Sequence, residues 1–187
     1  MTRQCLSVLA DWGFVGTLSI LTKSNLVTRD IDILKGFKQA AVGLTVTSAD
    51  DGISRYFEKY APPVSERFEA LKKLNQAGLR TYAFIGPLLP HFVADEAGLE
   101  KVFQKLAEVG TNDIYAEHLN LSSYIRGRLM AEMKGADKKI LRKFYSSQTK
   151  EYRQELEGLV GRLVKKYGMN ILLDLVIFHR EFQREGK

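Results

Sequence analysis

Short apolar runs alternate with amphipathic helical stretches through most of this chain, and no other feature constrains its fold as strongly. Runs rich in β-branched and aromatic residues have the length and pattern of buried strands at residues 18–22, 42–47, 81–86 and 113–119. Helical patterns separate these runs. Strands that alternate with helices form a parallel sheet with right-handed crossovers, so the sequence predicts an α/β fold.

Capping residues mark where the predicted helices begin and end. Thr28 and Ser65 each precede an apolar helical stripe, and both residue types are favoured at a helix N-cap. Gly78 and Gly110 follow the last apolar residues of two helices, where glycine supplies the left-handed backbone that ends a helix. The strand and helix boundaries are therefore consistent with one another from residue 18 to residue 119.

The alternation stops after residue 119. From residue 137 to residue 167 apolar residues recur at helical spacing, which predicts one long helix or two helices in line, ended by Gly168. The apolar run 169–178 fits a last strand or a buried helix, and we favour a helix from about Ile171. The sequence thus divides into an α/β part, residues 1–121, and a helical C-terminal extension packed on it, residues 122–187.

Polar side chains follow the first two predicted strands. Lys23 and Ser24 come directly after residues 18–22, and a two-residue period places the hydroxyls of Thr45 and Thr47 on one face of the second strand. Ligands of parallel α/β sheets bind at the carboxyl ends of the strands, which is where Lys23 lies. The alternative is a solvated loop lysine with two ordinary strand threonines.

Other polar residues carry less weight as site candidates. Glu117 and His118 are adjacent strand residues whose side chains point to opposite sides, and His118 is expected to bond to the backbone. His91 and His179 have no evident partner. Asp50 fits a turn better than a magnesium site.

Composition excludes several classes of protein. Cys5 is the single cysteine, so this chain alone forms no internal disulfide and no cysteine-ligated metal site. Its thiol lies beside an apolar helix face that includes Trp12, and we expect it to be partly buried. No apolar run reaches the ~20 residues that span a bilayer, and no signal-peptide core is present, which predicts a cytoplasmic location and no membrane partner.

The net charge of +6 permits contact with nucleic acid. Much of the excess lies in the last third of the chain, where basic residues are interleaved with Glu151, Glu155 and Glu157. Mixed charge of this kind is typical of a solvated helix face, which we rank above a nucleic-acid groove.

A set of short motifs occurs in order between residues 2 and 121. It comprises residues 20–24 and 29–32, 42–47, Glu58 with Ala61 and Pro62, Glu66 with Arg67, 77–79, and 85–90. This ordered set resembles the radical SAM superfamily, in the branch described as spore photoproduct lyase-like or DNA repair photolyase.

The resemblance implies a partial (β/α) barrel that holds a [4Fe-4S] cluster and S-adenosylmethionine at the carboxyl ends of its strands. It also implies a reaction in which reductive cleavage of the sulfonium gives a 5′-deoxyadenosyl radical that abstracts a hydrogen atom from substrate. By position, Lys23 resembles the residue that pairs with the methionine carboxylate. The full set of cofactor contacts that the resemblance implies is Lys23, Ser24, Thr45, Thr47, Ile85 and Pro87.

The family's CxxxCxxC loop, which holds the cluster, has no counterpart in this sequence. The cysteine that returns a hydrogen atom to the product in the spore photoproduct lyase branch has no counterpart either. The resemblance therefore implies the C-terminal part of a larger enzyme, inactive alone, whose partner is an N-terminal cluster-binding segment. Such a chain leaves the edge of its first strand unpaired, so we expect self-association through that edge.

Two other functions stay open at this point. One is a cluster-free (β/α) module in which Lys23, Thr45 and Thr47 hold an anionic metabolite, although the glycine-rich loop typical of phosphate sites is missing. The other is a nucleic-acid interaction protein that uses the basic C-terminal helix. Phe144, Tyr152 and Tyr167 fall on its apolar face, which disfavours a stacking platform.

Overall fold

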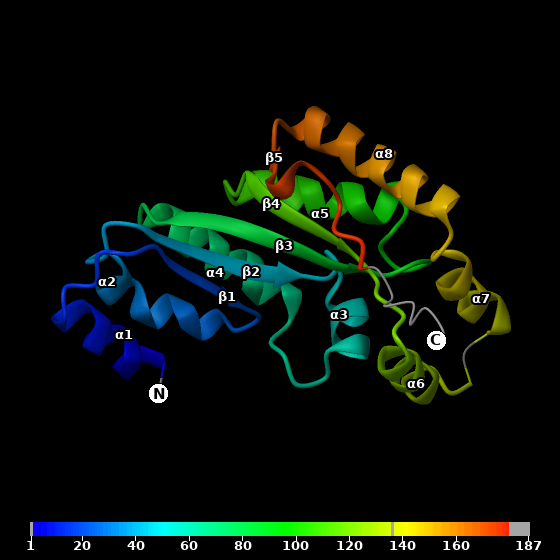
Figure 1. The fold of residues 1–187 in the computed structure, drawn as a ribbon, viewed down its shortest axis with the longest axis horizontal. Helices are drawn as coiled ribbons and strands as arrows, with labels where there is room; N and C mark the ends of the chain where they lie inside the picture. The colour runs from blue at the N-terminus through cyan, green and yellow to red at the C-terminus, as the bar shows by residue number, and fades with distance from the viewer. Residues whose placement is uncertain (1, 136, 180–187) are drawn as a thin grey trace, which may run out of the picture.

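The structure is a computed structural model, and it describes residues 2–135 and 137–179. Its centre is one parallel sheet with the strand order β1-β2-β3-β4-β5 (Figure 1). The strands are β1 (Leu18–Thr22), β2 (Ala40–Val46), β3 (Arg80–Leu88), β4 (Asp113–His118) and β5 (Asn170–Ile171). Every strand pairs in parallel with its neighbour, which confirms the predicted α/β fold.

Helices connect consecutive strands, and one precedes β1. They are α1 (Thr2–Asp11), α2 (Ile31–Leu34), α3 (Asp51–Phe57), α4 (Val64–Gln76), α5 (Glu96–Glu108), α6 (Ser123–Glu132), α7 (Lys138–Ser146) and α8 (Lys150–Tyr167). Two 3₁₀ segments complete the order, η1 (Asn25–Asp30) and η2 (Leu172–Asp174). None of the helices in the described ranges combines the length and the apolar character that crossing a bilayer requires.

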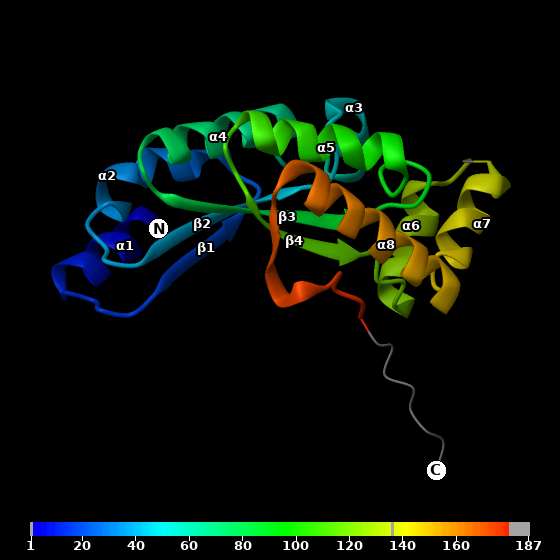
Figure 2. The same ribbon diagram turned by 90° about the horizontal axis from the view of Figure 1, so that it is seen from above.

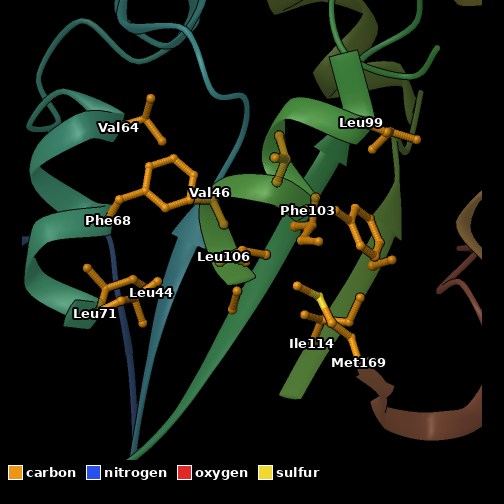
Figure 3. Close-up of a cluster of buried hydrophobic side chains, with 14 of the residues drawn as sticks. Leu44, Val46, Val64, Phe68, Leu71, Leu99, Phe103, Leu106, Ile114 and Met169 are labelled. Atoms are coloured by element: carbon orange, nitrogen blue, oxygen red, sulfur yellow. The ribbon is translucent and has the colours of Figure 1, made fainter. Parts of the chain in front are cut away.

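One face of the sheet is covered by helices and carries the core. Helices α4 and α5 run along this face, and α8 packs against α5 (Figure 2). Leu44 and Val46 of β2 meet Phe68 of α4, while Ile114 of β4 meets Phe103 of α5 (Figure 3). Each such side chain contributes about 1.5–3 kcal/mol when it is fully buried.

No helix of the described chain covers the opposite face of β1 to β4, which is turned toward the viewer in Figure 1. Alternate residues of β3 and β4 are half-exposed there, as strand geometry requires. The rings of Tyr82 and Phe84 lie 5.5 Å and 6.0 Å from the ring of Tyr115. A sheet with helices on one face and an open inner face is the arrangement of a partial (β/α) barrel.

Two predicted N-caps are wrong. Ser24, not Thr28, caps η1, because the Ser24 hydroxyl accepts a hydrogen bond from the amide of Leu26 at 3.3 Å. Ser65 lies inside the first turn of α4, and both its amide and its hydroxyl donate to Asp51. The glycine stops are confirmed, since Gly78 and Gly110 have left-handed backbone conformations.

The predicted helix from Ile171 is also wrong. Gly168 ends α8 in a left-handed conformation, after which the amide of Asn170 donates to the carbonyl of Asn112 at 2.8 Å. This contact brings residues 170–171 beside β4 as the short strand β5. The helical stretch before it is two helices, α7 and α8, with Thr149 as the N-cap of α8.

Three smaller expectations change with the structure. Strand β3 continues through Pro87 to Leu88, with an irregular register against β4 at that point. Trp12 is 87% exposed, so it lies outside the buried face of α1, which rests on Leu6. Cys5 is exposed as well, because it occupies the solvent side of the same short helix.

Candidate functional site

A cavity of about 310 Å³ lies at the carboxyl ends of the first strands. Lys23 follows β1, Thr47 follows β2, and Pro87 lies near the end of β3. Helix α6 closes the opposite wall with Ile125 and Arg128, among other residues. The cavity is therefore apolar over most of its wall, with charged side chains where Lys23 and Glu58 enter it and on the α6 wall.

Glu58, directly after α3, is the centre of the charged end. Its Oε1 atom lies 2.6 Å from Nζ of Lys23, and its Oε2 atom lies 2.6 Å from Nη2 of Arg67. The hydroxyl of Thr47 donates to the same Oε2 atom at 3.2 Å. A single carboxylate thus joins β1, β2 and α4 at the base of the cavity.

Arg67 is fully buried, and every part of its guanidinium is engaged. Nη1 donates to the carbonyl of Thr45 at 3.0 Å, while Nε and Nη2 donate to the carbonyl of Pro62 at 3.1 Å and 2.8 Å. A buried charge needs such complete pairing to be tolerated. Arg67 is therefore a positioning residue that fixes Glu58, and it does not face the cavity itself.

Glu58 Oε1 and Lys23 retain the capacity to bind a ligand. Oε1 is buried and, among the described residues, receives no hydrogen bond of good geometry, although the Lys23 ammonium is close. The side chain of Lys23 is 44% exposed, so its ammonium has donors left for another anion. A carboxylate beside Lys23 and an ammonium beside Glu58 would satisfy both groups, and an α-amino acid carries this pair of charges.

The structure brings three of the six predicted cofactor contacts together: Lys23, Thr47 and Pro87 all line the cavity. The other three lie elsewhere. Ser24 caps η1, Thr45 contributes its carbonyl to Arg67, and Ile85 is buried among core residues. The side chain of Ile85 points toward the helices because it alternates with Phe84 and Gly86, which occupy the open face.

Glu58, Arg67 and Arg128 were not among the predicted contacts. Arg67 had a detectable signal, since it lies one residue before Phe68 within the apolar stripe of α4, where an arginine needs a buried partner. Glu58 belongs to the ordered motif set, but its sequence context gave no sign of a place at the cavity, because its partners come from the end of β1 and from α4. Arg128 reaches the cavity only through the packing of α6 against the strand ends.

Two of the other polar candidates gain partners. Nε2 of His179 lies 2.6 Å from Oε1 of Glu117, and Nδ1 of His91 lies 3.4 Å from Nζ of Lys143. His118 is buried and its Nε2 bonds to the carbonyl of Ser147 at 2.8 Å, as expected for a strand-end histidine held by backbone. Asp50 is the N-cap of α3, because its side chain accepts hydrogen bonds from the amides of Gly52 and Ile53. Its role is therefore a local structural one, as the sequence favoured.

An iron–sulfur cluster has no set of ligands in this chain. Cys5 is the single cysteine and lies in α1, on the solvent side. Within residues 2–135 and 137–179, no three His, Cys, Asp or Glu side chains are grouped as a metal site requires. The residues at the cavity fit an amino-acid group, whereas they do not fit a cluster.

No family model matches the sequence. Two uncharacterized proteins are similar to it. One, from Methanocaldococcus jannaschii, is 40% identical over 108 residues, which is 57% of this chain and 39% of that protein. The other, from Acidianus two-tailed virus, is 28% identical over 156 residues, 79% of this chain and 48% of that protein. The chain thus spans less than half the length of the relatives it matches.

Solved structures that share this fold include radical SAM enzymes. Spore photoproduct lyase matches 89% of this chain and 52% of its own with a TM-score of 0.67 at 15% identity, including a variant with bound AdoMet. A domain of pyruvate-formate lyase-activating enzyme from Bacteroides vulgatus gives 0.61 at 14% identity, covering 91% of this chain and 90% of that domain. SuiB of Streptococcus suis gives 0.56 at 12% identity, covering 90% and 33%. The fold is therefore that of radical SAM enzymes.

Proposed function

We propose that this chain is the C-terminal part of a radical SAM enzyme of the spore photoproduct lyase-like kind, and that its cavity binds S-adenosylmethionine. The observation that carries this proposal is the meeting of Lys23, Thr47 and Pro87 at one cavity. These residues lie at the ends of three different strands. The position agrees with the rule that ligands of such folds bind at the carboxyl ends of the strands.

In this proposal the charged end of the cavity holds the amino-acid end of the cofactor. The Lys23 ammonium pairs with the methionine carboxylate, and Glu58 Oε1 accepts from the methionine ammonium. Arg67 prevents Glu58 from turning away, since it holds the Oε2 atom. Pro87 and Phe57 supply apolar wall for the rest of the molecule.

The cluster belongs to a segment that this chain does not contain. When S-adenosylmethionine is bound beside a reduced [4Fe-4S] cluster, it supplies a carbon radical that abstracts hydrogen. The residues of this chain contribute binding and orientation of the cofactor. These residues lie at the ends of rigid strands, and sites supported by strands position a ligand more precisely than sites on loops do.

Calorimetric titration of the chain with S-adenosylmethionine tests the proposal. We expect binding that Lys23→Ala and Glu58→Gln each weaken by about tenfold or more, since hydrogen bonds to charged groups contribute about 1.5–3 kcal/mol. S-adenosylhomocysteine should bind in the same way, because its amino-acid end is identical.

Lys72→Ala is the matched control, because this exposed lysine lies on α4 and away from the cavity. Its affinity should equal that of the unchanged chain. Equal affinity of Lys23→Ala and Lys72→Ala would contradict the assigned role of Lys23. Binding of a simple anion in place of S-adenosylmethionine would instead favour the cluster-free module.

A further inference from the structure

A second cavity lies at the end of the sheet opposite the proposed cofactor site. Its volume is about 490 Å³, against about 310 Å³ for the cavity at the carboxyl ends of the strands. Its walls come from the amino ends of β1, β2 and β3 and from the segment that follows α2. Figure 1 shows this end of the sheet beside α2, at the opposite end of the molecule from α6. A cavity of this size is large enough for a small organic molecule.

The buried part of the cavity lining is apolar. Leu34 ends α2 and Phe37 follows it, and both side chains are buried. Ala41 lies in β2, where it pairs with Ser19 of β1 on one side and with Arg80 of β3 on the other. Regular strand pairing therefore holds this part of the lining in place. It forms an apolar surface that can cover the carbon part of a ligand.

The charged part of the lining is entirely basic. Lys35, Lys38 and Arg80 line the cavity, and none of the described residues in its wall is an aspartate or a glutamate. Within residues 2–135 and 137–179, neither exposed lysine forms an ion pair. Arg80 pairs with Asp113 through Nε at 3.3 Å and Nη2 at 3.0 Å, and its Nη1 atom has no partner in the same ranges. The cavity thus contains cations that the protein does not neutralise.

Gln39 adds a neutral donor that a neighbouring side chain holds in place. The hydroxyl of Thr17 donates to Oε1 of Gln39 at 2.7 Å. This contact engages the amide oxygen, and no acceptor in the described part of the chain engages the two N–H groups of the same amide. Ammonium, guanidinium and amide N–H groups are therefore what the cavity offers to a ligand.

The basic residues are not needed to complete the helix ends beside them. Cations near a helix C-terminus commonly compensate carbonyls that lack partners. Here the last carbonyls of α2 accept from the amides of residues 35–37, and the last carbonyls of α4 accept from those of residues 77–79. Backbone bonds thus satisfy both helix ends, and the side-chain cations stay available for a ligand.

We propose that this cavity binds a small organic phosphate, with Lys35, Lys38 and Arg80 at the phosphate group and the apolar lining against the carbon part. A phosphate monoester carries a charge of about −1.5 to −2 at pH 7 and three strong acceptor oxygens, so it can engage several N–H donors at once. Arginine binds phosphate oxygens with two N–H groups, and lysine binds them as a point charge. The site lies outside the proposed cofactor cavity, so the inference does not depend on binding of S-adenosylmethionine.

Two-dimensional NMR of the isotope-labelled chain, titrated with phenyl phosphate, tests the inference. Phenyl phosphate joins a phosphate monoester to an apolar ring, which matches the two parts of the cavity. The amide signals of Thr17, Gln39 and Leu79 should shift, and the shifts should saturate as the concentration rises. Benzyl alcohol, which has a similar ring and no phosphate, should not shift them.

The variant with Lys35→Gln and Lys38→Gln should bind phenyl phosphate about tenfold or more weakly, because it loses two charge-assisted contacts. The control variant, with Lys101→Gln and Lys165→Gln on α5 and α8, removes the same charge outside the cavity. Its affinity should stay within about twofold of the unchanged chain, since exposed charges at a distance are screened. Circular dichroism of both variants checks that the fold is retained.

Several results would overturn the inference. One is the absence of shifts at millimolar phenyl phosphate, and another is an equal loss of affinity in the two double variants. Lys23→Ala gives a further check, because Lys23 lines the cofactor cavity. If Lys23→Ala weakened binding and the changes at Lys35 and Lys38 did not, the phosphate would bind in the cofactor cavity instead. Benzoate or citrate binding as tightly as phenyl phosphate would contradict the assignment to a phosphate.

Discussion

Beside the cavity, a buried arginine holds a carboxylate in one orientation. Arg67 binds Glu58 and the carbonyls of Thr45 and Pro62, so it ties the segment after α3 to the end of β2. If Arg67 were absent, the carbonyls of Thr45 and Pro62 would lose their donor inside the protein, and Glu58 Oε2 would lose its charged partner. Burial of polar groups without partners is what makes such changes costly.

We therefore expect Arg67→Ala to lower the free energy of unfolding by about 3–5 kcal/mol, the usual loss when one member of a buried ion pair is removed. Arg80→Ala is the control, because Arg80 forms an exposed pair with Asp113 at 3.0 Å. Its loss should stay below about 1 kcal/mol. Urea unfolding followed by circular dichroism measures both values. Similar losses in the two variants would mean that Arg67 is not the anchor described.

At the scale of elements, His118 connects the sheet to the helical C-terminal part. It ends β4, and its Nε2–H donates to the carbonyl of Ser147, which lies directly after α7. The Nδ1 atom is buried and has no hydrogen-bond partner in the described part of the chain. Burial lowers the pKa of His118 below its usual value, and the nearby charge of Arg153 acts in the same direction.

This lowered pKa makes stability depend on pH. The unfolded chain takes up a proton at His118 below about pH 6.5, whereas the folded chain takes it up only at lower pH. The contribution of His118 to the free energy of unfolding is therefore fully present above about pH 6.5, and it declines as the pH falls below this value. Urea unfolding at about pH 7.5, 6.5 and 5.5 should show this decline. His118→Gln should flatten the profile, and an unchanged profile in this variant would contradict the role of His118.

Elements with a long periodic pattern could be predicted from sequence, and elements defined by distant contacts could not. Helix α5 was predicted because Leu99, Val102 and Phe103 repeat at helical spacing and are all buried. Strand β5 has two residues, and its conformation depends on the contact of Asn170 with Asn112. An apolar run gives no information on such a contact, so the sequence favoured a helix from Ile171 that the structure does not form.

The candidate site follows the same rule. Lys23 and Thr47 could be predicted because strand alternation and strand ends are properties of the local sequence. The contact between Lys23 and Glu58 joins residues far apart in the chain, and it depends on how β1 and α3 are placed by the sheet. Arg128 depends on a further step, the packing of α6 over the cavity.

At the scale of the whole molecule, β1 is an edge strand: among the described strands it pairs with β2 alone. In β1 the amide of Leu18 donates toward β2, to the carbonyl of Gln39 at 2.8 Å. Alternate residues of a parallel strand bond to the same neighbour, so Ser19 and Leu21 direct their backbone groups away from β2. Leu21 is 48% exposed, and exposed apolar side chains, Trp12 and Val15, lie in the chain just before β1. An uncovered edge with apolar surroundings is a site for pairing with another strand.

We therefore predict that the chain self-associates through β1 as its concentration rises, with light scattering showing an increasing average mass. Leu21→Lys should reduce this association, because it places a charge where the second strand would pack. Leu26→Lys adds the same charge to an exposed leucine of η1, outside the edge, and should leave the mass unchanged. If the unchanged chain stays monomeric at the highest concentration, backbone groups of β1 are satisfied by water alone. If both variants reduce the mass equally, association depends on net charge, and the edge of β1 is not the contact.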